Sequence, residues 1–279
     1  MVQVQKNSVA RWRFSLGQEL PRWQVCAEND AQDSHNPIHD NRLAQQLGFA
    51  GGLVPGVTLY GYLTHPLLAV FGRAFLAQGS LEVRFRRPVY AGETVTTVVR
   101  VSEVGEADYE FQIELRKGTD EVCAVGSARF PADTHAARPA PANAPLPKSR
   151  RPATPEELRA NPLLGSLHEV FTPAQSAPFV AGLGDSLELY QTLVHPSWLL
   201  RQANYLLDRN LALGPWIHTE SRIQHLGVVR LDEPFSVHGE VVALSTRKGN
   251  DYADIDVLIA TSKPIMRVLH RAIYRMPPP

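Results

Sequence analysis

The sequence predicts an α+β protein built from two copies of one unit, in which a long buried helix is wrapped by an antiparallel sheet. Residues 80–130 and 216–276 each form a series of segments with apolar side chains at every second position, a period typical of strands. Each series follows a strongly apolar helical segment. A stretch rich in proline and alanine separates the two series. The expected organisation is an N-terminal unit over 1–130, a linker over 131–157 and a C-terminal unit over 158–279.

The strands of the N-terminal unit follow from short alternating segments. Two are expected at the start of the chain, in RWRFSLGQEL and WQVCAEN. Four more are separated by glycine-containing turn signals: SLEVRFRRPVY, ETVTTVVRVSEV, DYEFQIELRKG and EVCAVGSARF. The short connections between these four predict that consecutive strands pair with each other, as in a meander.

Two helices are expected between the early strands and the meander. Pro37 is placed to open the first helix, with Asn36 or Ser34 as its N-terminal cap. The second helix begins at Gly56 and Val57 and is apolar nearly all round, so it is expected to be buried. The first N–H groups of a helix have no partner within it and lie at its positive end. Those of Gly56 and Val57 are therefore suited to stabilise a developing oxyanion.

The C-terminal unit repeats this order. The segment VFTPAQSAPFVAG is expected to be strand- or loop-like, and LYQTLVHPSWLLRQANYLLDR to be a long helix with Pro196 in its first turn. Four further strands are expected in WIHTESRIQHLGVV, EPFSVHGEVVALSTRKG, DYADIDVLIATS and PIMRVLHRAIYRM. The helix starts LVPGVTLYGYL and LVHPSWLLRQANYL align, which indicates a duplication.

Composition and missing motifs exclude several classes of protein. The 28 basic and 28 acidic residues cancel, which argues against binding to nucleic acid or to an anionic membrane. The N-terminal sequence has no apolar leader, so a soluble, cytoplasmic protein is expected, with Cys26 and Cys123 as buried reduced thiols. The chain has no G-x-S-x-G, phosphate loop or C-x-x-C, and its histidines lack metal-ligand spacing. Neither a cofactor nor a metal is expected.

One segment resembles a known signature. SHNPIHDNRLAQQLGF followed by GLVPGVTLYGYL resembles the D-x-N-P-x-H motif and central-helix start of MaoC-like, or (R)-specific, enoyl thioester hydratases and dehydratases. The duplicated unit resembles the hotdog fold in its double-hotdog arrangement. The resemblance implies syn addition or loss of water on an acyl thioester of CoA or acyl carrier protein. It also implies that His39 is the catalytic histidine, that Asn36 is the motif asparagine, and that the Gly56 N–H receives the thioester carbonyl.

The sequence departs from the motif at its aspartate, which is Ser34 here. A serine hydroxyl cannot act as a base near neutral pH without activation. Asp33 is adjacent, but neighbouring side chains of an extended segment point to opposite faces. Asp33 and Ser34 are therefore candidates both for catalysis, with His39 and Asn36, and for simple helix capping. The candidate substrate-binding residues are Gly56, Val57, His35, Tyr60 and His195.

Three functions stay open from the sequence. The first is a hydro-lyase acting on an acyl thioester or a related β-hydroxy carbonyl compound, with His39 as acid or base. The second is a hotdog thioesterase, which needs a carboxylate or an activated water near the thioester carbon. The third is a non-catalytic subunit that binds acyl thioesters or a partner protein. The sequence also leaves open whether two chains form a homodimer.

Overall fold

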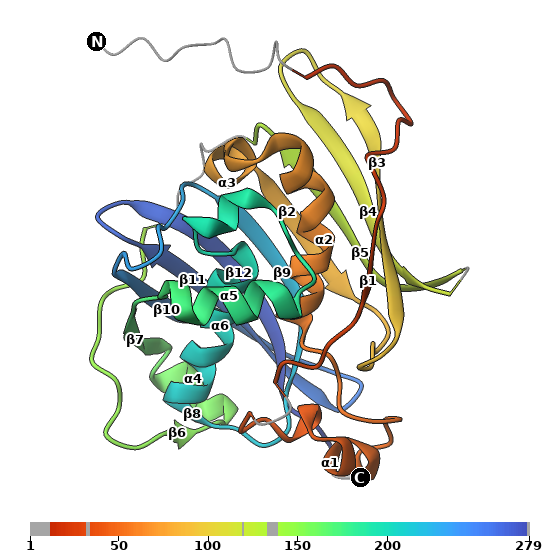
Figure 1. Cartoon of the computed structure of the whole chain (residues 1–279). Coiled ribbons are helices and arrows are strands. Elements are labelled where there is room, and N and C mark those ends of the chain that lie inside the picture. The colour runs from red at the N-terminus through yellow and green to blue at the C-terminus, as the bar shows by residue number, and fades with distance from the viewer. Residues whose placement is uncertain (1–11, 32–33, 119, 133–138, 278–279) are drawn as a thin grey trace.

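The computed structural model describes residues 12–31, 34–118, 120–132 and 139–277. Ten strands form one antiparallel sheet, and the two longest helices lie on the same face of it (Figure 1). The N-terminal half contributes β1 (Trp23–Cys26), β2 (Ser80–Phe85), β3 (Thr94–Val104), β4 (Tyr109–Lys117) and β5 (Glu121–Phe130). The C-terminal half contributes β7 (Leu163–Glu169), β9 (Ile217–His225), β10 (Phe235–Arg247), β11 (Asn250–Ala260) and β12 (Pro264–Arg275). This is the α+β architecture that the sequence predicts.

The strand order shows an internal symmetry. Across the sheet it is β1-β3-β4-β5-β2-β9-β12-β11-β10-β7, so each half has the same order when read from its outer edge to the centre. The halves meet where β2 pairs with β9, in a register that places Val83 opposite Ser221. Because this junction is an ordinary antiparallel ladder, the two units share one continuous sheet.

The pairing of β2 differs from the predicted meander. β3, β4 and β5 do pair consecutively, but β2 pairs with β5 and β9 rather than with β3. After β2 the N–H groups of Arg86 and Arg87 both donate to the carbonyl of Cys123, at 2.8 and 3.1 Å. These bonds hold the chain on the β5 side of β2, and residues 86–93 then cross to reach β3 at the far side of the half-sheet.

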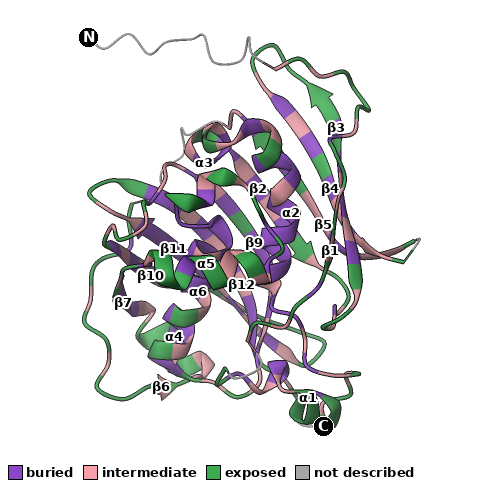
Figure 2. Cartoon of the chain, in the orientation of Figure 1, coloured by how far each residue is buried: buried purple, intermediate pink, exposed green. Residues whose placement is uncertain are grey.

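The central helices are α2 (Gly56–Phe71) and α6 (Pro196–Asn210), as expected. Most of α2 is buried, and Figure 2 shows this burial where the helix lies against the sheet. Near their N-termini the two helices touch: Ser197 Oγ donates to the carbonyl of Val57 at 2.7 Å. A Cβ added at Gly61 would lie 3.2 Å from that of Ser197, so the missing side chain allows this close approach.

Three predicted segments have different local structure. The described part of RWRFSLGQEL, expected to be a strand, is irregular, and only Glu19 forms an isolated bridge, with Arg100. The expected first helix is a 3₁₀ turn, η2 (Pro37–His39), followed by the short α1 (Asn41–Gln46), because the Asp40 side chain caps a new helix at Leu43 N–H. The segment expected to be strand- or loop-like contains α5 (Pro173–Gly182). Thr172 and Gln175 form a capping box there, a T-x-x-Q signal that stands in the sequence.

The remaining elements are short. They are α3 (Arg73–Gln78), α4 (Pro155–Ala160), η3 (Glu188–Gln191) and the parallel pair β6 (Arg151–Pro152) and β8 (Leu211–Ala212). The described part of the Pro/Ala-rich segment packs on the C-terminal half, since the N–H of Ser166 donates to the carbonyl of Ala144 at 2.8 Å. Cys123 is buried as expected, but Cys26 is exposed because it lies in the edge strand β1.

Candidate functional site

The N-P-x-H segment is held between the two halves by Asn36. Its Oδ1 accepts from the N–H of Ile38, which caps the 3₁₀ turn, and also from the N–H of Trp216 at 3.3 Å. Its Nδ2 donates to the carbonyl of Trp216 at 2.9 Å. Trp216 directly precedes β9, so this buried amide connects the motif to the C-terminal half.

His39 is buried, and its ring orientation is fixed by the backbone. Nδ1 lies 2.8 Å from the carbonyl oxygen of Leu53. A carbonyl oxygen only accepts, so Nδ1 carries the proton and Nε2 carries the lone pair. Burial lowers the pKa of His39, and the bond to Leu53 opposes this only in part. His39 is therefore a neutral imidazole with a basic Nε2 near neutral pH.

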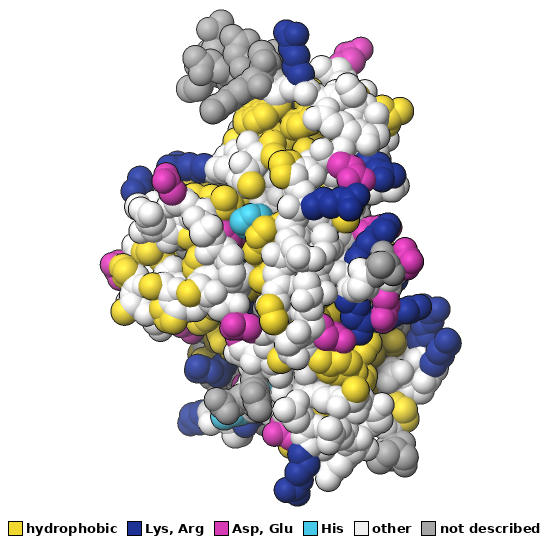
Figure 3. Space-filling model, turned by 45° about the vertical axis from the view of Figure 1, so that its right-hand side comes forward, with side chains coloured by type: hydrophobic (Ala, Val, Ile, Leu, Met, Phe, Trp, Pro, Cys, Tyr) yellow, Lys and Arg dark blue, Asp and Glu magenta, His cyan; other side chains and the backbone are white. Residues whose placement is uncertain are grey.

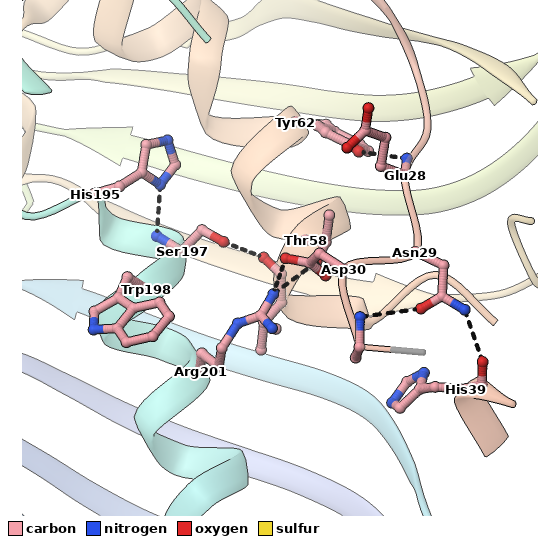
Figure 4. Close-up of polar contacts among 12 residues, drawn as sticks. Glu28, Asn29, Asp30, His39, Thr58, Tyr62, His195, Ser197, Trp198 and Arg201 are labelled. Atoms are coloured by element: carbon pink, nitrogen blue, oxygen red, sulfur yellow. Dashed lines mark hydrogen bonds and ion pairs between the residues drawn. The ribbon is translucent and has the colours of Figure 1, made fainter. Parts of the chain in front are cut away.

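The backbone around His39 is also fixed. Asn29 Nδ2 donates to the carbonyl of His39 at 2.8 Å (Figure 4). Gly52 lies so close on the other side that an added Cβ would be 2.1 Å from the same carbonyl oxygen. Only glycine fits there, which accounts for one glycine of the G-G-L-V-P-G run.

The start of α2 offers free backbone donors. Pro55 accepts from the N–H groups of Thr58 and Leu59, so the helical ladder begins there. The N–H groups of Gly56 and Val57 make no hydrogen bond within the described residues. They lie at the positive end of a 16-residue helix.

Two cavities meet at His39. The inner cavity has a volume of about 190 Å³ and the outer one about 660 Å³. The inner lining is largely apolar and includes Ile38, Phe49, Leu53, Val54, Leu59, Phe85, Val89 and Ile217, together with Gly56 and His218. The outer lining is largely polar and includes Asn29, Asp30, Ser34, His35, Arg201, Tyr205, Asp208 and Arg209. Four residues line both: Asn36, His39, Asn204 and Trp216.

An ion pair between the buried Arg201 and the part-exposed Asp30, which the sequence pattern does not indicate, forms one wall of the outer cavity. Asp30 accepts from Thr58 Oγ1 at 2.7 Å and pairs with Arg201, whose Nη2 also donates to Thr58 at 3.0 Å (Figure 4). The Arg201 side chain is only 7% exposed. The pair ties the loop before the motif to both central helices. Its sequence signal is weak, since A-E-N-D reads as an ordinary strand end.

Breaking this pair is expected to destabilise the fold. Asp30→Asn retains an acceptor for Thr58 but leaves the buried Arg201 charge without its counter-ion. Because the Asp30 side chain is 24% exposed, we expect a cost of about 1–3 kcal/mol in the free energy of unfolding, between the values for exposed and for buried pairs. Urea unfolding of the variant measures this. Glu82→Gln is the control, because its pair with Arg222 at 3.4 Å is exposed on both sides and such pairs contribute less than about 1 kcal/mol. Equal effects of the two substitutions would contradict the assignment.

The other predicted site residues are placed as follows. Asp33 lies outside the described residues. Ser34 and His35 are exposed at the outer cavity, and the buried Val57 also lines that cavity. Tyr60 and His195 are fully buried and line neither cavity.

Tyr60 and His195 make internal contacts instead. The Tyr60 hydroxyl lies 3.0 Å from His225 Nε2, and burial raises the pKa of Tyr60. His195 caps α6, since its Nδ1 accepts from the N–H of Ser197 at 3.0 Å. Its Nε2 lies 3.5 Å from the buried carboxylate of Asp185. The bonds of Tyr60 and of His195 Nδ1 satisfy core groups, and the latter stabilises the start of α6.

Comparisons with known proteins define the class of fold. A model of the thioesterase superfamily matches residues 71–124. A Mycobacterium tuberculosis protein described as a double hotdog fold superposes with a TM-score of 0.56, at 14% identity over 93% of this chain and 96% of that one. A structure from Chloroflexus aurantiacus, named as a MaoC domain dehydratase, superposes with a TM-score of 0.66, at 12% identity over 95% of this chain and 97% of that one. The chain has a double hotdog fold.

One match in sequence is more specific. The chain is 34% identical over 88 residues to 3-hydroxyacyl-thioester dehydratase Y of Mycobacterium tuberculosis, and the match spans 30% of each protein. The match in sequence agrees with the resemblance to thioester dehydratases over this part of the chain, and the structural similarities show the fold.

Acidic and basic side chains are interspersed along the face in Figure 3, without a single-sign patch. Among the described residues, no three His, Cys, Asp or Glu side chains are arranged to hold a metal ion. None of the described helices is long and apolar enough to cross a membrane.

Proposed function

We propose that this protein is a hydro-lyase that adds water to, or removes water from, an acyl thioester of CoA or acyl carrier protein. The observation that carries this proposal is His39, a buried neutral imidazole with its proton fixed on Nδ1, at the point where an apolar and a polar cavity meet. The apolar cavity suits a short acyl chain. The polar cavity, with the exposed Arg209, suits the carrier.

The reaction balances with His39 as the single acid–base group. In dehydration, Nε2 takes the proton from C2 while the C3–O bond breaks and the C2=C3 double bond forms. The proton held on Nε2 then goes to the departing hydroxide, which leaves as water. Taking and giving the proton on one face makes the elimination syn. The N–H of Gly56 stabilises the charge that develops on the thioester oxygen. This route needs no carboxylate, in agreement with Ser34 at the motif aspartate position.

The test is a hydration assay with trans-2-enoyl-CoA substrates of increasing chain length, together with an assay for free thiol. Loss of the enoyl absorbance without thiol release supports the hydro-lyase. Thiol release without double-bond chemistry identifies the thioesterase instead, and tight binding without either change identifies the non-catalytic subunit. Ser34→Asp adds a decisive variant: activity that appears only in this variant means that the native chain has given up hydration.

The pH dependence of hydration is expected to follow His39. Burial lowers its pKa below the ordinary value of 6.5, so the basic form is already fully populated at neutral pH. We expect kcat/KM to be constant from pH 7 upward and to fall tenfold per pH unit on the acid side, with its inflection below 6.5. Steady-state rates from pH 4.5 to 8.5 measure this. An inflection at or above 7 contradicts a buried His39 as the base.

A further inference from the structure

A second histidine in the wall of the inner cavity has no role in the route above. His218 is the second residue of β9, in the C-terminal half, and its side chain is buried. It lines the inner cavity together with His39 and Gly56. The edge of the Phe85 ring packs near it, with ring centroids 4.9 Å apart.

One ring nitrogen of His218 lies against the start of α2. A Cβ added at Gly56 would be 2.8 Å from His218 Nδ1, so the imidazole lies beside the helix terminus that carries the free N–H groups. Within the described residues, Nδ1 has no hydrogen-bond partner although it is buried. Buried polar atoms nearly always have a partner, and an atom without one in a cavity wall is suited to bind a ligand group.

The other ring nitrogen takes part in a short series of hydrogen bonds between side chains. Nε2 lies 2.8 Å from Ser221 Oγ, which lies 3.2 Å from His270 Nδ1. Residues three apart on a regular strand point to opposite faces. Here β9 has an irregularity at Thr219 in its pairing with β12, which brings His218 and Ser221 to the same face.

The hydrogen bonds from His218 through Ser221 to His270 determine what His218 can bind. Burial, and next to it the neighbouring His270, lower the pKa of His218, while the backbone carbonyl of Glu220 opposes them more weakly. The ring is therefore neutral. Because the Ser221 hydroxyl both donates and accepts, the hydrogen bonds from His218 through Ser221 to His270 can all point in either direction. Nδ1 can thus accept from a ligand or donate to it, which matches a hydroxyl or a water molecule.

We propose that His218 Nδ1 binds the 3-hydroxyl of a 3-hydroxyacyl thioester, and the attacking water in the reverse direction. The inference rests on the proposed function and deepens it, because it names the group that holds the departing oxygen. His39 then moves the proton, and His218 holds the oxygen that receives it. Ser34 stands at the position of the motif aspartate and is exposed at the outer cavity, and in this proposal the C-terminal half supplies the polar contact.

A matched pair of substitutions separates binding from a structural role. The polar atoms of Asn lie near the position of a histidine Nδ1, whereas those of Gln lie near Nε2. His218→Asn therefore keeps the cavity contact and loses Ser221, while His218→Gln keeps Ser221 and loses the cavity contact. His238→Gln is the control, since His238 also bonds two serines, Ser166 and Ser236, but does not line the cavity.

Calorimetric titration with 3-hydroxybutanoyl-CoA and butanoyl-CoA measures discrimination for the hydroxyl. We expect the native protein, His218→Asn and His238→Gln to prefer the hydroxyacyl thioester about tenfold, and His218→Gln to lose this preference. We also expect kcat/KM for crotonyl-CoA hydration to fall 10–100-fold in His218→Gln and less in His218→Asn. Thermal melts verify that each variant is folded.

The outcomes distinguish the two proposals. Preference retained in His218→Gln, with hydration still dependent on His39, overturns the role of His218 and leaves the proposed function standing. Hydroxyl preference that depends on His218, without any turnover, supports the binding site and overturns the hydro-lyase. A native protein that binds neither thioester overturns both.

Discussion

Replacing His39 by alanine is expected to lower kcat/KM for crotonyl-CoA hydration about 10²–10⁴-fold, the usual effect of removing a positioned acid–base group. The structure gives two reasons for a loss toward the upper end. His39 is the only acid–base group that the proposed route uses, and its Nε2 is already deprotonated at neutral pH because burial lowers its pKa. Steady-state rates with a fixed set of enoyl-CoA chain lengths provide the measurement.

A second variant separates chemistry from architecture at this position. His39→Asn keeps a donor near the place of Nδ1 for the Leu53 carbonyl but has no equivalent of Nε2. We expect it to be as inactive as His39→Ala and more stable. His168→Ala is the control, because that histidine is exposed on the edge strand β7. Full activity in His39→Asn would falsify the assignment of Nε2 as the base.

Mild acid is expected to destabilise the folded protein strongly. Burial lowers the pKa of His225 and that of His270 to about 3, so both are neutral in the folded state. Below the ordinary value of 6.5 the unfolded chain binds protons at these sites and the folded chain does not. Stability is therefore complete above pH 6.5 and is lost progressively between about 6.5 and 3, by roughly 1 kcal/mol per histidine and pH unit.

Urea unfolding at pH 7.5, 6.5, 5.5 and 5.0 measures this loss. We expect the free energy of unfolding to be nearly level between the first two values and to fall steeply below them. His225→Gln removes one proton-binding site of the unfolded chain. The slope of the free energy of unfolding against pH is therefore expected to decrease by the contribution of one histidine. His168→Gln, an exposed histidine, serves as the control with an unchanged slope. A level curve down to pH 5 contradicts the burial of these rings as neutral groups.

The fold was readable from the sequence where local patterns agree with the tertiary structure. The later strands with period two, the apolar α2 and the Pro196 start of α6 appear as expected, because each depends on residues close in the chain. The strand expected in RWRFSLGQEL does not form over its described residues. The place of β2 depends on contacts that sequence periodicity does not contain. The alternation of apolar and polar residues in β2 is the same whether the strand pairs with β3, β5 or β9. The hydrogen bonds from Arg86 and Arg87 to Cys123 help to keep it beside β5.

The candidate site divides in the same way. His39, Asn36 and Gly56 lie within one local segment, and a motif can therefore point to them. Arg201 and His218 come from the other half, and nothing near them in the sequence indicates the cavity. For His218 the irregularity at Thr219 even reverses the face that simple alternation predicts. Tyr60 and His195 show the opposite error, in which sequence position suggests a site that the structure does not have. Polar residues at helix starts and on central helices can make all their hydrogen bonds within the core.

The β2–β9 junction has a consequence for the protein during its synthesis. β2 ends at Phe85 and β9 begins at Ile217, so more than 130 residues are translated before the central ladder can close. At about 5–20 residues per second, this leaves the six-residue β2 edge of the first half-sheet unpaired on the ribosome for roughly 7 to 26 s. During that time the backbone of β2 is open to pairing with other nascent chains. The yield of soluble protein should therefore depend on uninterrupted translation through β9, and a pause between residues 131 and 216 should favour aggregation of the emerging first half.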